Sequence, residues 1–228
     1  FTALDPGLPA VRYGSVAWGD YDNDGRLDVL LTGYGNAAVY RNNGNDTFSN
    51  ALAGLTAVSS SSAAWGDYDR DGRLDILVSG DTGSSRISRL YHNQNTPTDS
   101  VPFSPTNLLA ALAGGIVNLA WSPAFDSQTS SNGLTYNLRI GTFSGGEDVL
   151  SAAAAPDGTR RVVRYGNAGH TTNATVTHLS RGVYYWSVQA IDTGFAGSAF
   201  AAEQSFVIPP LTIRAMINAS DTLQLDFT

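Results

Sequence analysis

The sequence predicts an all-β protein, and three observations support that fold class. Nearly all of the 20 acidic residues are Asp, with only two Glu, and Lys is absent. Asp is common in turns, whereas Glu and Lys favour exposed helices. The chain also holds 24 Gly and only 14% charged residues. Its apolar residues recur in short alternating runs between turn residues, which is the period of half-buried strands.

The same composition bounds the size and the class of the protein. A chain of 228 residues can form one large or two small domains. The net charge of −7 argues against nucleic-acid binding, which needs a basic patch. Without Cys there are no disulfides or thiolate metal sites, and no apolar run reaches the roughly 18 residues of a membrane span. Because the chain begins at Phe1, we expect a piece of a longer or processed protein.

A repeated segment organises the first part of the chain. The sequence WGDYDNDGRLDVL at residues 18–30 recurs as WGDYDRDGRLDIL at residues 65–77. We therefore divide residues 1–99 into two copies of one unit, residues 1–47 and 48–95. Within the first copy, turn residues separate four short runs of strand-forming residues. Four short strands in about 45 residues are the pattern of one propeller blade, so two four-stranded blades are expected.

Each copy places four Asp at positions 1, 3, 5 and 9 of a loop, with Gly at position 6. Carboxylates this close together repel one another unless a cation lies between them. Ca²⁺ suits such a loop, because it accepts 6–8 oxygen ligands in irregular geometry and can take a backbone carbonyl at position 7. Position 12 lacks the Glu of an EF-hand. We predict two Ca²⁺ sites, with ligands from Asp20, Asp22, Asp24, Arg26 and Asp28 in the first, and from Asp67, Asp69, Asp71, Arg73 and Asp75 in the second.

Through the shared core Gly-Asp-Tyr-Asp-x-Asp-Gly-Arg-Leu-Asp, the two units resemble FG-GAP/VCBS repeats, the calcium-loop blades of integrin-type β-propellers. The resemblance covers about residues 1–97 and implies calcium binding in a secreted or cell-surface setting. Members of this family usually close a ring of about seven blades. Since two blades cannot close a ring, either further blades precede Phe1 or neighbouring chains cover the open edges.

A second domain is expected at residues 100–208, where Pro becomes common and the Asp-rich loops stop. Seven strand-like runs suggest a β-sandwich: 108–112, 116–121, 134–142, 160–165, 174–179, 184–191 and 204–208. This stretch resembles a fibronectin type III domain at residues 119–121, 134–140 and 179–192. In the last of these, Arg181 replaces the usual Pro of the family's tyrosine corner, and the alternation favours Tyr184 over Tyr185 as the corner tyrosine.

The last segment, residues 209–228, begins with the linker signal Pro209-Pro210. Two alternating runs on either side of residues 218–221 predict a β-hairpin, which is too small to be stable alone. It would start a further β element or dock on a neighbour. A β-arm at one end and open blades at the other also allow chain-to-chain association, so a homo-oligomer is one possibility.

No enzyme is predicted, because the sequence holds no nucleophile-elbow, zinc-protease or dinucleotide-binding motif. Surface or packing roles are expected for its three histidines, His92, His170 and His178. The expected function is a non-enzymatic, calcium-binding structural and interaction module of adhesion type. Its partners would be other domains, copies of the same chain, or an extracellular protein or glycan.

Three alternatives remain open: a carbohydrate-binding module, a subunit of an extracellular filament, and an accessory segment of a larger secreted hydrolase. The carbohydrate-binding alternative needs exposed aromatic side chains that can stack on sugars. Packing roles are expected for the aromatics that recur in both repeats, and contact roles suit better those without a twin. The recurring residues are Trp18, Tyr21, Trp65 and Tyr68, and those without a twin are Tyr13, Tyr34 and Tyr40.

Overall fold

The computed structural model describes residues 1–69, 71–95, 99–210, 213–217 and 223–227, and within these ranges it contains strands and no helix. Consequently, no helix in this part of the chain has the length and apolar character needed to cross a membrane. The strands are β1 (Ser15–Gly19), β2 (Asp28–Gly33), β3 (Asn36–Asn42), β4 (Phe48–Asn50), β5 (Ser59–Gly66), β6 (Asp75–Asp81), β7 (Arg86–Tyr91), β8 (Thr106–Ala113), β9 (Ile116–Ser122), β10 (Thr135–Gly141), β11 (Asn173–Val176), β12 (Gly182–Ile191), β13 (Gln204–Ile208), β14 (Ile213–Ile217) and β15 (Leu223–Phe227). The all-β class predicted from the sequence is confirmed.

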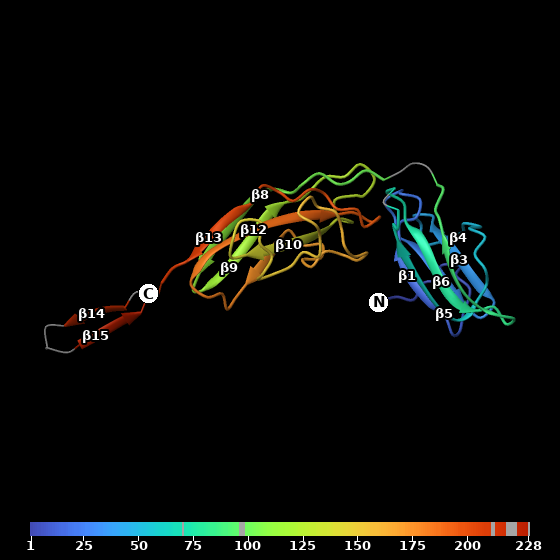
Figure 1. Cartoon of the computed structure of the whole chain (residues 1–228), viewed down its shortest axis with the longest axis horizontal. Helices are drawn as coiled ribbons and strands as arrows, with labels where there is room; N and C mark the ends of the chain where they lie inside the picture. The colour runs from blue at the N-terminus through green and yellow to red at the C-terminus, as the bar shows by residue number, and fades with distance from the viewer. Residues whose placement is uncertain (70, 96–98, 211–212, 218–222, 228) are drawn as a thin grey trace.

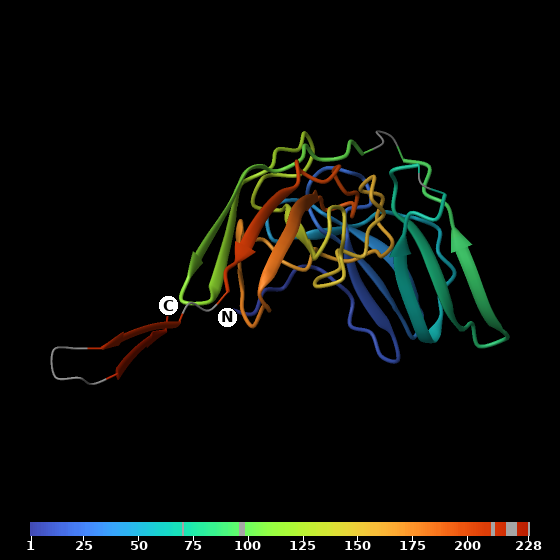
Figure 2. The ribbon, with the colours of Figure 1, turned by 60° about the vertical axis from the view of Figure 1, so that its left-hand side comes forward.

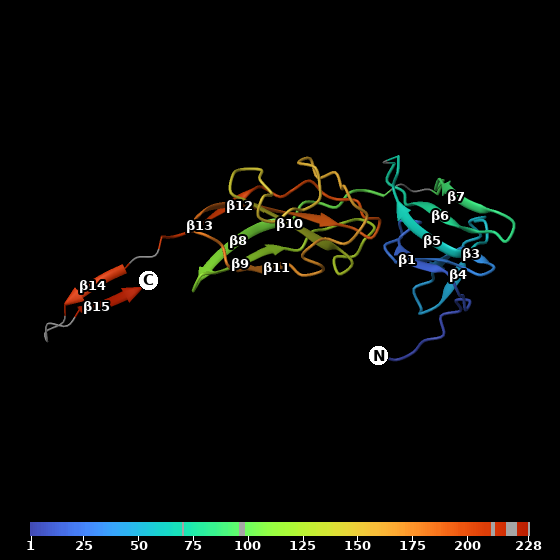
Figure 3. The same cartoon turned by 60° about the horizontal axis from the view of Figure 1, so that its bottom comes forward.

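The sheets follow one another along an elongated molecule (Figure 1). Sheets β1–β4 and β5–β7 lie at one end, strands β8–β13 form the middle, and the hairpin β14–β15 lies at the end away from the blades (Figures 1 and 3). The hairpin was predicted from the alternation in residues 209–228. Its predicted turn, residues 218–221, lies outside the described residues.

The first blade has the four strands that its sequence predicts, in the order β1-β2-β3-β4, all antiparallel. Its two faces are both apolar. One face packs against the second blade, and the other is covered in part by Leu8 and Val11 of the N-terminal segment. That segment is held by backbone hydrogen bonds, among them one from the Phe48 amide to the Pro6 carbonyl. Residues 1–14 therefore act as a lid over the outer face of the first blade.

The second blade differs from its prediction, because the described residues form three strands, β5-β6-β7, and not four. The chain that follows β7 makes other backbone hydrogen bonds where a fourth strand was expected. The Asp99 amide donates to the Gly72 carbonyl of the blade's own loop, and the Phe103 amide donates to the Phe125 carbonyl of the next domain. Backbone that would extend the sheet is thus already paired along the connection to the sandwich.

The two blades stack with unlike faces together; their blue and teal strands lie side by side in Figure 2. Leu30 and Val39 of the first blade pack against Trp65 and Ile76 of the second. As a result, Trp65 is 8% exposed. Its repeat partner Trp18 contacts Phe48 on the outer face of the first blade and is 51% exposed. The packing role expected for Trp65 agrees with its burial, which leaves its ring unavailable for stacking on a sugar.

The opposite face of the second blade is open in the described part of the chain. Leu77 and Leu90 are cross-strand partners on this face, and they are 52% and 51% exposed. Their counterparts in the first blade, Leu30 and Val39, are 0% and 1% exposed because the second blade covers them. The outer face of the first blade is covered in part by Leu8 and Val11, whereas Leu77 and Leu90 lack such a cover within the described residues.

The middle of the molecule is a sandwich of two three-stranded antiparallel sheets, β11-β9-β8 and β10-β12-β13. Trp186 is fully buried at the centre of its core, 6.5 Å from Trp121 between ring centroids. The Tyr184 hydroxyl donates to the Ser180 carbonyl at 2.9 Å, so Tyr184 is the corner tyrosine that the alternation favoured.

Six of the seven strands predicted for the sandwich are present, but residues 160–165 do not form one. Their place beside β10 is taken by the side chain of Asn167. Its Oδ1 accepts the Leu138 amide and its Nδ2 donates to the Leu138 carbonyl, both at 2.8 Å. Asn167 thus pairs with Leu138 as a neighbouring strand would, while the backbones of Gly169 and Leu150 pair with Tyr136 and Ile140 on either side. Arg160 is turned toward the carbonyls of Ala152 and Arg164, which no regular strand would allow.

The corner hydrogen bond can be tested by Tyr184→Phe, which removes the hydroxyl and leaves the ring stacked on Phe206. We expect the free energy of unfolding to fall by about 1 kcal/mol, because a part-buried hydrogen bond is lost. Urea denaturation followed by Trp fluorescence measures this change. Tyr185→Phe is the matched control, since the Tyr185 hydroxyl makes no hydrogen bond within the described residues. Equal losses in the two variants would contradict the corner assignment.

Candidate metal centre

The first aspartate loop, residues 20–28, joins β1 to β2 and is organised by its own carboxylates. Asp20 accepts the amides of Asp24 at 3.0 Å and Gly25 at 2.8 Å, which closes the loop. Asp28 accepts the Tyr21 amide at 3.0 Å and the Asn42 amide, at the end of β3, at 2.8 Å. Backbone N–H groups thus hold the two carboxylates inside the loop.

The second aspartate loop, residues 67–75, repeats this geometry between β5 and β6. Asp67 accepts the amides of Asp71 and Gly72, both at 3.1 Å. Asp75 accepts the Tyr68 amide at 3.2 Å and the Asn93 amide at 2.8 Å. Two stretches of different surroundings therefore fold into the same loop, which indicates that the shared aspartates determine its shape.

Each loop brings three of its four predicted carboxylate ligands together. In each group, one oxygen from every member lies within 4.8 Å of the others. The groups are Asp20, Asp22 and Asp28 in the first loop, and Asp67, Asp69 and Asp75 in the second. The remaining aspartates, Asp24 and Asp71, form ion pairs with Arg26 and Arg73 of their own loops. The ligand role of the Arg26 and Arg73 carbonyls stays a prediction.

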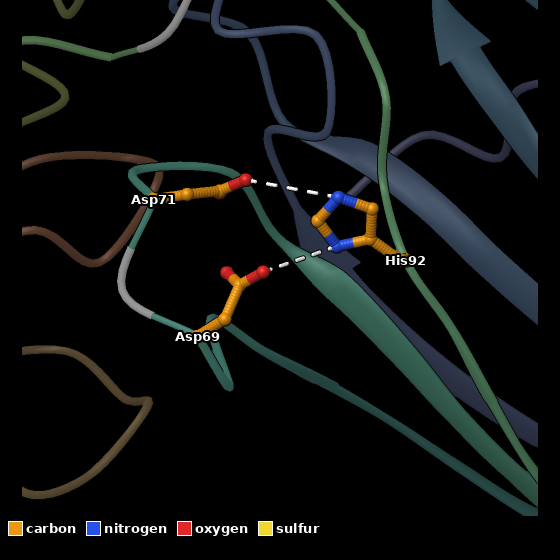
Figure 4. Close-up of side chains that lie close together, drawn as sticks. All are labelled: Asp69, Asp71 and His92. Carbon is orange, nitrogen blue, oxygen red and sulfur yellow. Dashed lines mark ion pairs between the residues drawn. The ribbon is translucent and has the colours of Figure 1, made fainter.

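A basic side chain at the end of the third strand of each blade faces the aspartate loop. The repeat offset of 47 residues did not align these two basic residues. In the first loop, Arg41 Nε lies 2.5 Å from Asp22 Oδ2, and its other end lies 2.8 Å from Asp24 Oδ2. In the second, His92 follows β7 and its imidazole lies between Asp69 and Asp71 (Figure 4). Its ring nitrogens lie 3.3 Å from Asp69 and 3.9 Å from Asp71. His92 is thus part of the candidate site, and the role expected for it from sequence is corrected.

The sequence does hold a signal for these basic residues. Tyr40-Arg41-Asn42 and Tyr91-His92-Asn93 match when the offset is taken as 51 residues. In both copies the Asn side chain donates to the carbonyl before the position-9 Asp, at 3.1 Å. The two copies therefore correspond beyond the loop, after an insertion of four residues.

The first loop also touches the sandwich. The Thr193 hydroxyl donates to Asp20 Oδ2 at 2.7 Å, and the Asp20 amide donates to the Thr193 carbonyl at 3.4 Å. Gly25 has a positive φ of 81°, and a Cβ at this position would overlap the carbonyl oxygen of Gln128. Glycine is therefore required both by the turn and by the approach of the next domain.

Burial sets the electrostatics of the first loop. Removal from water raises the pKa of Asp28 to about 7; two backbone donors oppose this shift, and the charges of Asp22 and Asp20 add to it. Burial also raises the pKa of Asp20. Asp22 Oδ1 is buried and has no hydrogen-bond partner within the described residues. A hard cation would relieve all three effects, and the oxygen-only donor sets fit Ca²⁺.

One comparison with known proteins bears on the two loops. Residues 20–78, which contain both loops, match the model of the FG-GAP-like repeat. No curated protein matches the sequence. Among solved structures, the chicken interferon gamma receptor alpha chain aligns with 86% of this chain and 97% of its own length, at 9% identity and a TM-score of 0.33.

The aromatic residues considered for sugar stacking separate into two groups. Tyr40 is buried, with its hydroxyl 3.2 Å from Asn36 Oδ1, so its proposed contact role is wrong. Tyr13 and Tyr34 are both exposed and lie on either side of the Arg12 guanidinium, whose distances to the ring centroids are 5.8 and 4.5 Å. These two rings and Trp18 are exposed aromatic side chains of the first blade.

The raised pKa of Asp28 predicts how the metal-free protein responds to pH. The folded state holds the Asp28 proton up to about pH 7, whereas the unfolded chain releases it near 3.8. This contribution to stability is present in full below pH 3.8 and is lost as the pH rises through 7, amounting to roughly 4 kcal/mol. Urea denaturation in chelator between pH 4 and 8 measures it.

Asp28→Asn should flatten this pH dependence, because the substituted side chain does not titrate. Asp46→Asn, an exposed aspartate of the same blade, is the control and should keep the slope of the original protein. The same slope in Asp28→Asn as in the control would show that another group carries the dependence.

Proposed function

We propose that this chain is a non-enzymatic, calcium-binding structural and interaction module of a secreted or cell-surface protein. The observation that carries the proposal is the duplicated loop, in which two separate sets of three carboxylates converge with the same backbone hydrogen bonds. The match of residues 20–78 to the FG-GAP-like repeat supports it. The ligands are the ten residues predicted from the sequence.

The proposed role of the two ions is to fix the loop end of the blades. Asp28 ties the β1–β2 loop to the end of β3, and Asp75 does the same for β5, β6 and the residues after β7. An ion held by these carboxylates would connect three strand ends in each blade. Low-affinity sites of this kind fill where calcium is millimolar, which favours an extracellular setting.

The proposed partners are neighbouring domains, copies of the same chain, or an extracellular protein or glycan. The hairpin β14–β15 forms a sheet of its own within the described residues, and a two-stranded hairpin is marginal in isolation. We therefore propose that residues 209–228 dock on a neighbour.

A glycan ligand is the second candidate, favoured by the exposed pair Tyr13 and Tyr34 around Arg12. Flat aromatic faces with a nearby donor suit sugar rings. Glycan-array binding that is lost in Tyr34→Ala would support this candidate, whereas binding that survives the substitution would contradict it.

Calcium should raise the melting temperature of the blades. Binding to the folded state alone stabilises by about 2.7 kcal/mol per site at a hundred-fold excess over Kd. For a unit of this size that corresponds to a shift of roughly 10 °C per site. Differential scanning calorimetry with CaCl2 and with chelator measures the shift.

Single variants assign this effect to the loops. Asp28→Asn and Asp75→Asn should each lose part of the shift and the double variant most of it, while Asp46→Asn keeps it. A melting temperature of the blades that does not respond to calcium in the original protein would overturn the proposed function.

A further inference from the structure

Three carboxylates outside the two loops meet between the blades and the sandwich. Asp99 lies on the connection between the two domains, Asp126 lies in the loop between β9 and β10, and Asp192 directly follows β12. Asp99 and Asp192 lie on the same side of Gly194, and the charges of Asp99 and Asp126 both raise the pKa of Asp192. The three carboxylates come from three separate parts of the chain and belong to neither aspartate loop.

These carboxylates are buried and only half satisfied. Asp192 is 1% exposed and Asp126 is 6% exposed. Asp192 Oδ1 accepts the Ala196 amide at 2.7 Å, and Asp126 Oδ2 accepts the amides of Gln128 and Thr129 at 2.9 and 2.6 Å. The second oxygen of each, together with Asp99 Oδ1, is buried without a hydrogen-bond partner in the part of the chain that the structure describes.

Gly194 shows where the oxygen atoms converge. A Cβ on this residue would stand 2.8 Å from Asp99 Oδ2, 3.5 Å from Asp192 Oδ1 and 3.4 Å from Asn23 Oδ1. Asn23 is the fourth residue of the first aspartate loop, so side chains of the blade and of the sandwich meet at Gly194. A side chain on this residue would collide with Asp99 Oδ2, so glycine permits the close approach of Asp99 and Asp192.

The cluster has too little positive charge around it. Burial, followed by the charges of neighbouring aspartates, raises the pKa of Asp99 to about 6. Burial and the charge of Asp99 raise the pKa of Asp192 as well. Arg160 is the guanidinium that faces Asp192, but it donates its hydrogen bonds to the carbonyls of Ala152 and Arg164. Buried, unpaired carboxylates of this kind are costly unless they bind a cation or share a proton.

We propose that Asp99, Asp126 and Asp192 bind a third divalent cation of the Ca²⁺ class, which joins the blades to the sandwich. The donors are all oxygen, which selects a hard cation. These three carboxylates are not all within 4.8 Å of one another, unlike those of each loop. The ion therefore draws them together or completes its shell with water.

This site is separate from the two loop sites, so it can be tested apart from the proposed function. Native mass spectrometry of the whole chain with CaCl2 counts the bound ions. We expect three ions in the original protein, two in Asp99→Asn/Asp192→Asn, and one in Asp28→Asn/Asp75→Asn. Asp46→Asn is the control and should keep three. Circular dichroism establishes that each variant is folded.

The alternative occupant is a proton shared between Asp99 and Asp192, and the same variants distinguish it. In that case Asp99→Asn/Asp192→Asn binds as many ions as the original protein, which would overturn the proposal. If the original protein binds one ion and this variant binds none, the third site stands although the loop sites fail. If the ions are lost only with the loop aspartates, the loop sites stand and the third site is wrong.

A second measurement keeps the proposal testable should the double variant fail to fold. The single variant Asp126→Asn keeps one acceptor oxygen for the amides of Gln128 and Thr129. Isothermal titration with CaCl2 should show the loss of one binding event, or at least a ten-fold weaker one, with the remaining events unchanged. An isotherm identical to that of Asp46→Asn would contradict a role for Asp126 in cation binding.

Discussion

A buried aspartate at the start of the second strand holds each blade together at its loop end. Asp28 joins Tyr21 of its own loop to Asn42 beyond it, and the second blade repeats both hydrogen bonds. Such a carboxyl group is tolerated in the interior because it accepts two backbone donors. Arg41 supplies a permanent charge to the first loop, whereas His92 beside the second loop is charged only when protonated. Two loops of identical aspartate spacing therefore differ in their electrostatic surroundings.

Much of the fold was predictable because its signals are local. Alternation located the strands of the first blade, six strands of the sandwich and the C-terminal hairpin, and it distinguished Tyr184 from its neighbour. It failed at residues 160–165, since Asn167 replaces a strand with one amide side chain, and such a substitution leaves no periodic pattern. It also gave the second blade one strand too many, because the connection to the sandwich pairs with other backbone.

The candidate site was predictable only where its residues are close in sequence. The aspartate spacing within nine residues identified the loop carboxylates. Arg41 and His92 were missed because the hairpin between β6 and β7 is longer than that between β2 and β3, which shifts the correspondence by four residues. Asp99, Asp126 and Asp192 gave no signal at all, since only the packing of two domains brings them together. Sites at domain boundaries are invisible to spacing arguments for this reason.

The unlike-face stacking of the blades gives the stack a direction. The face of Trp65 lies against the face of Leu30, so the step from one blade to the next has no two-fold symmetry. Leu8 and Val11 cover part of the first-blade face that carries Trp18. The face of Leu77 and Leu90 presents the same kind of surface that the second blade covers on the first. Any further blade that stacks on it in the same way, from whichever chain, would therefore add in one orientation, a heterologous contact in the language of symmetry.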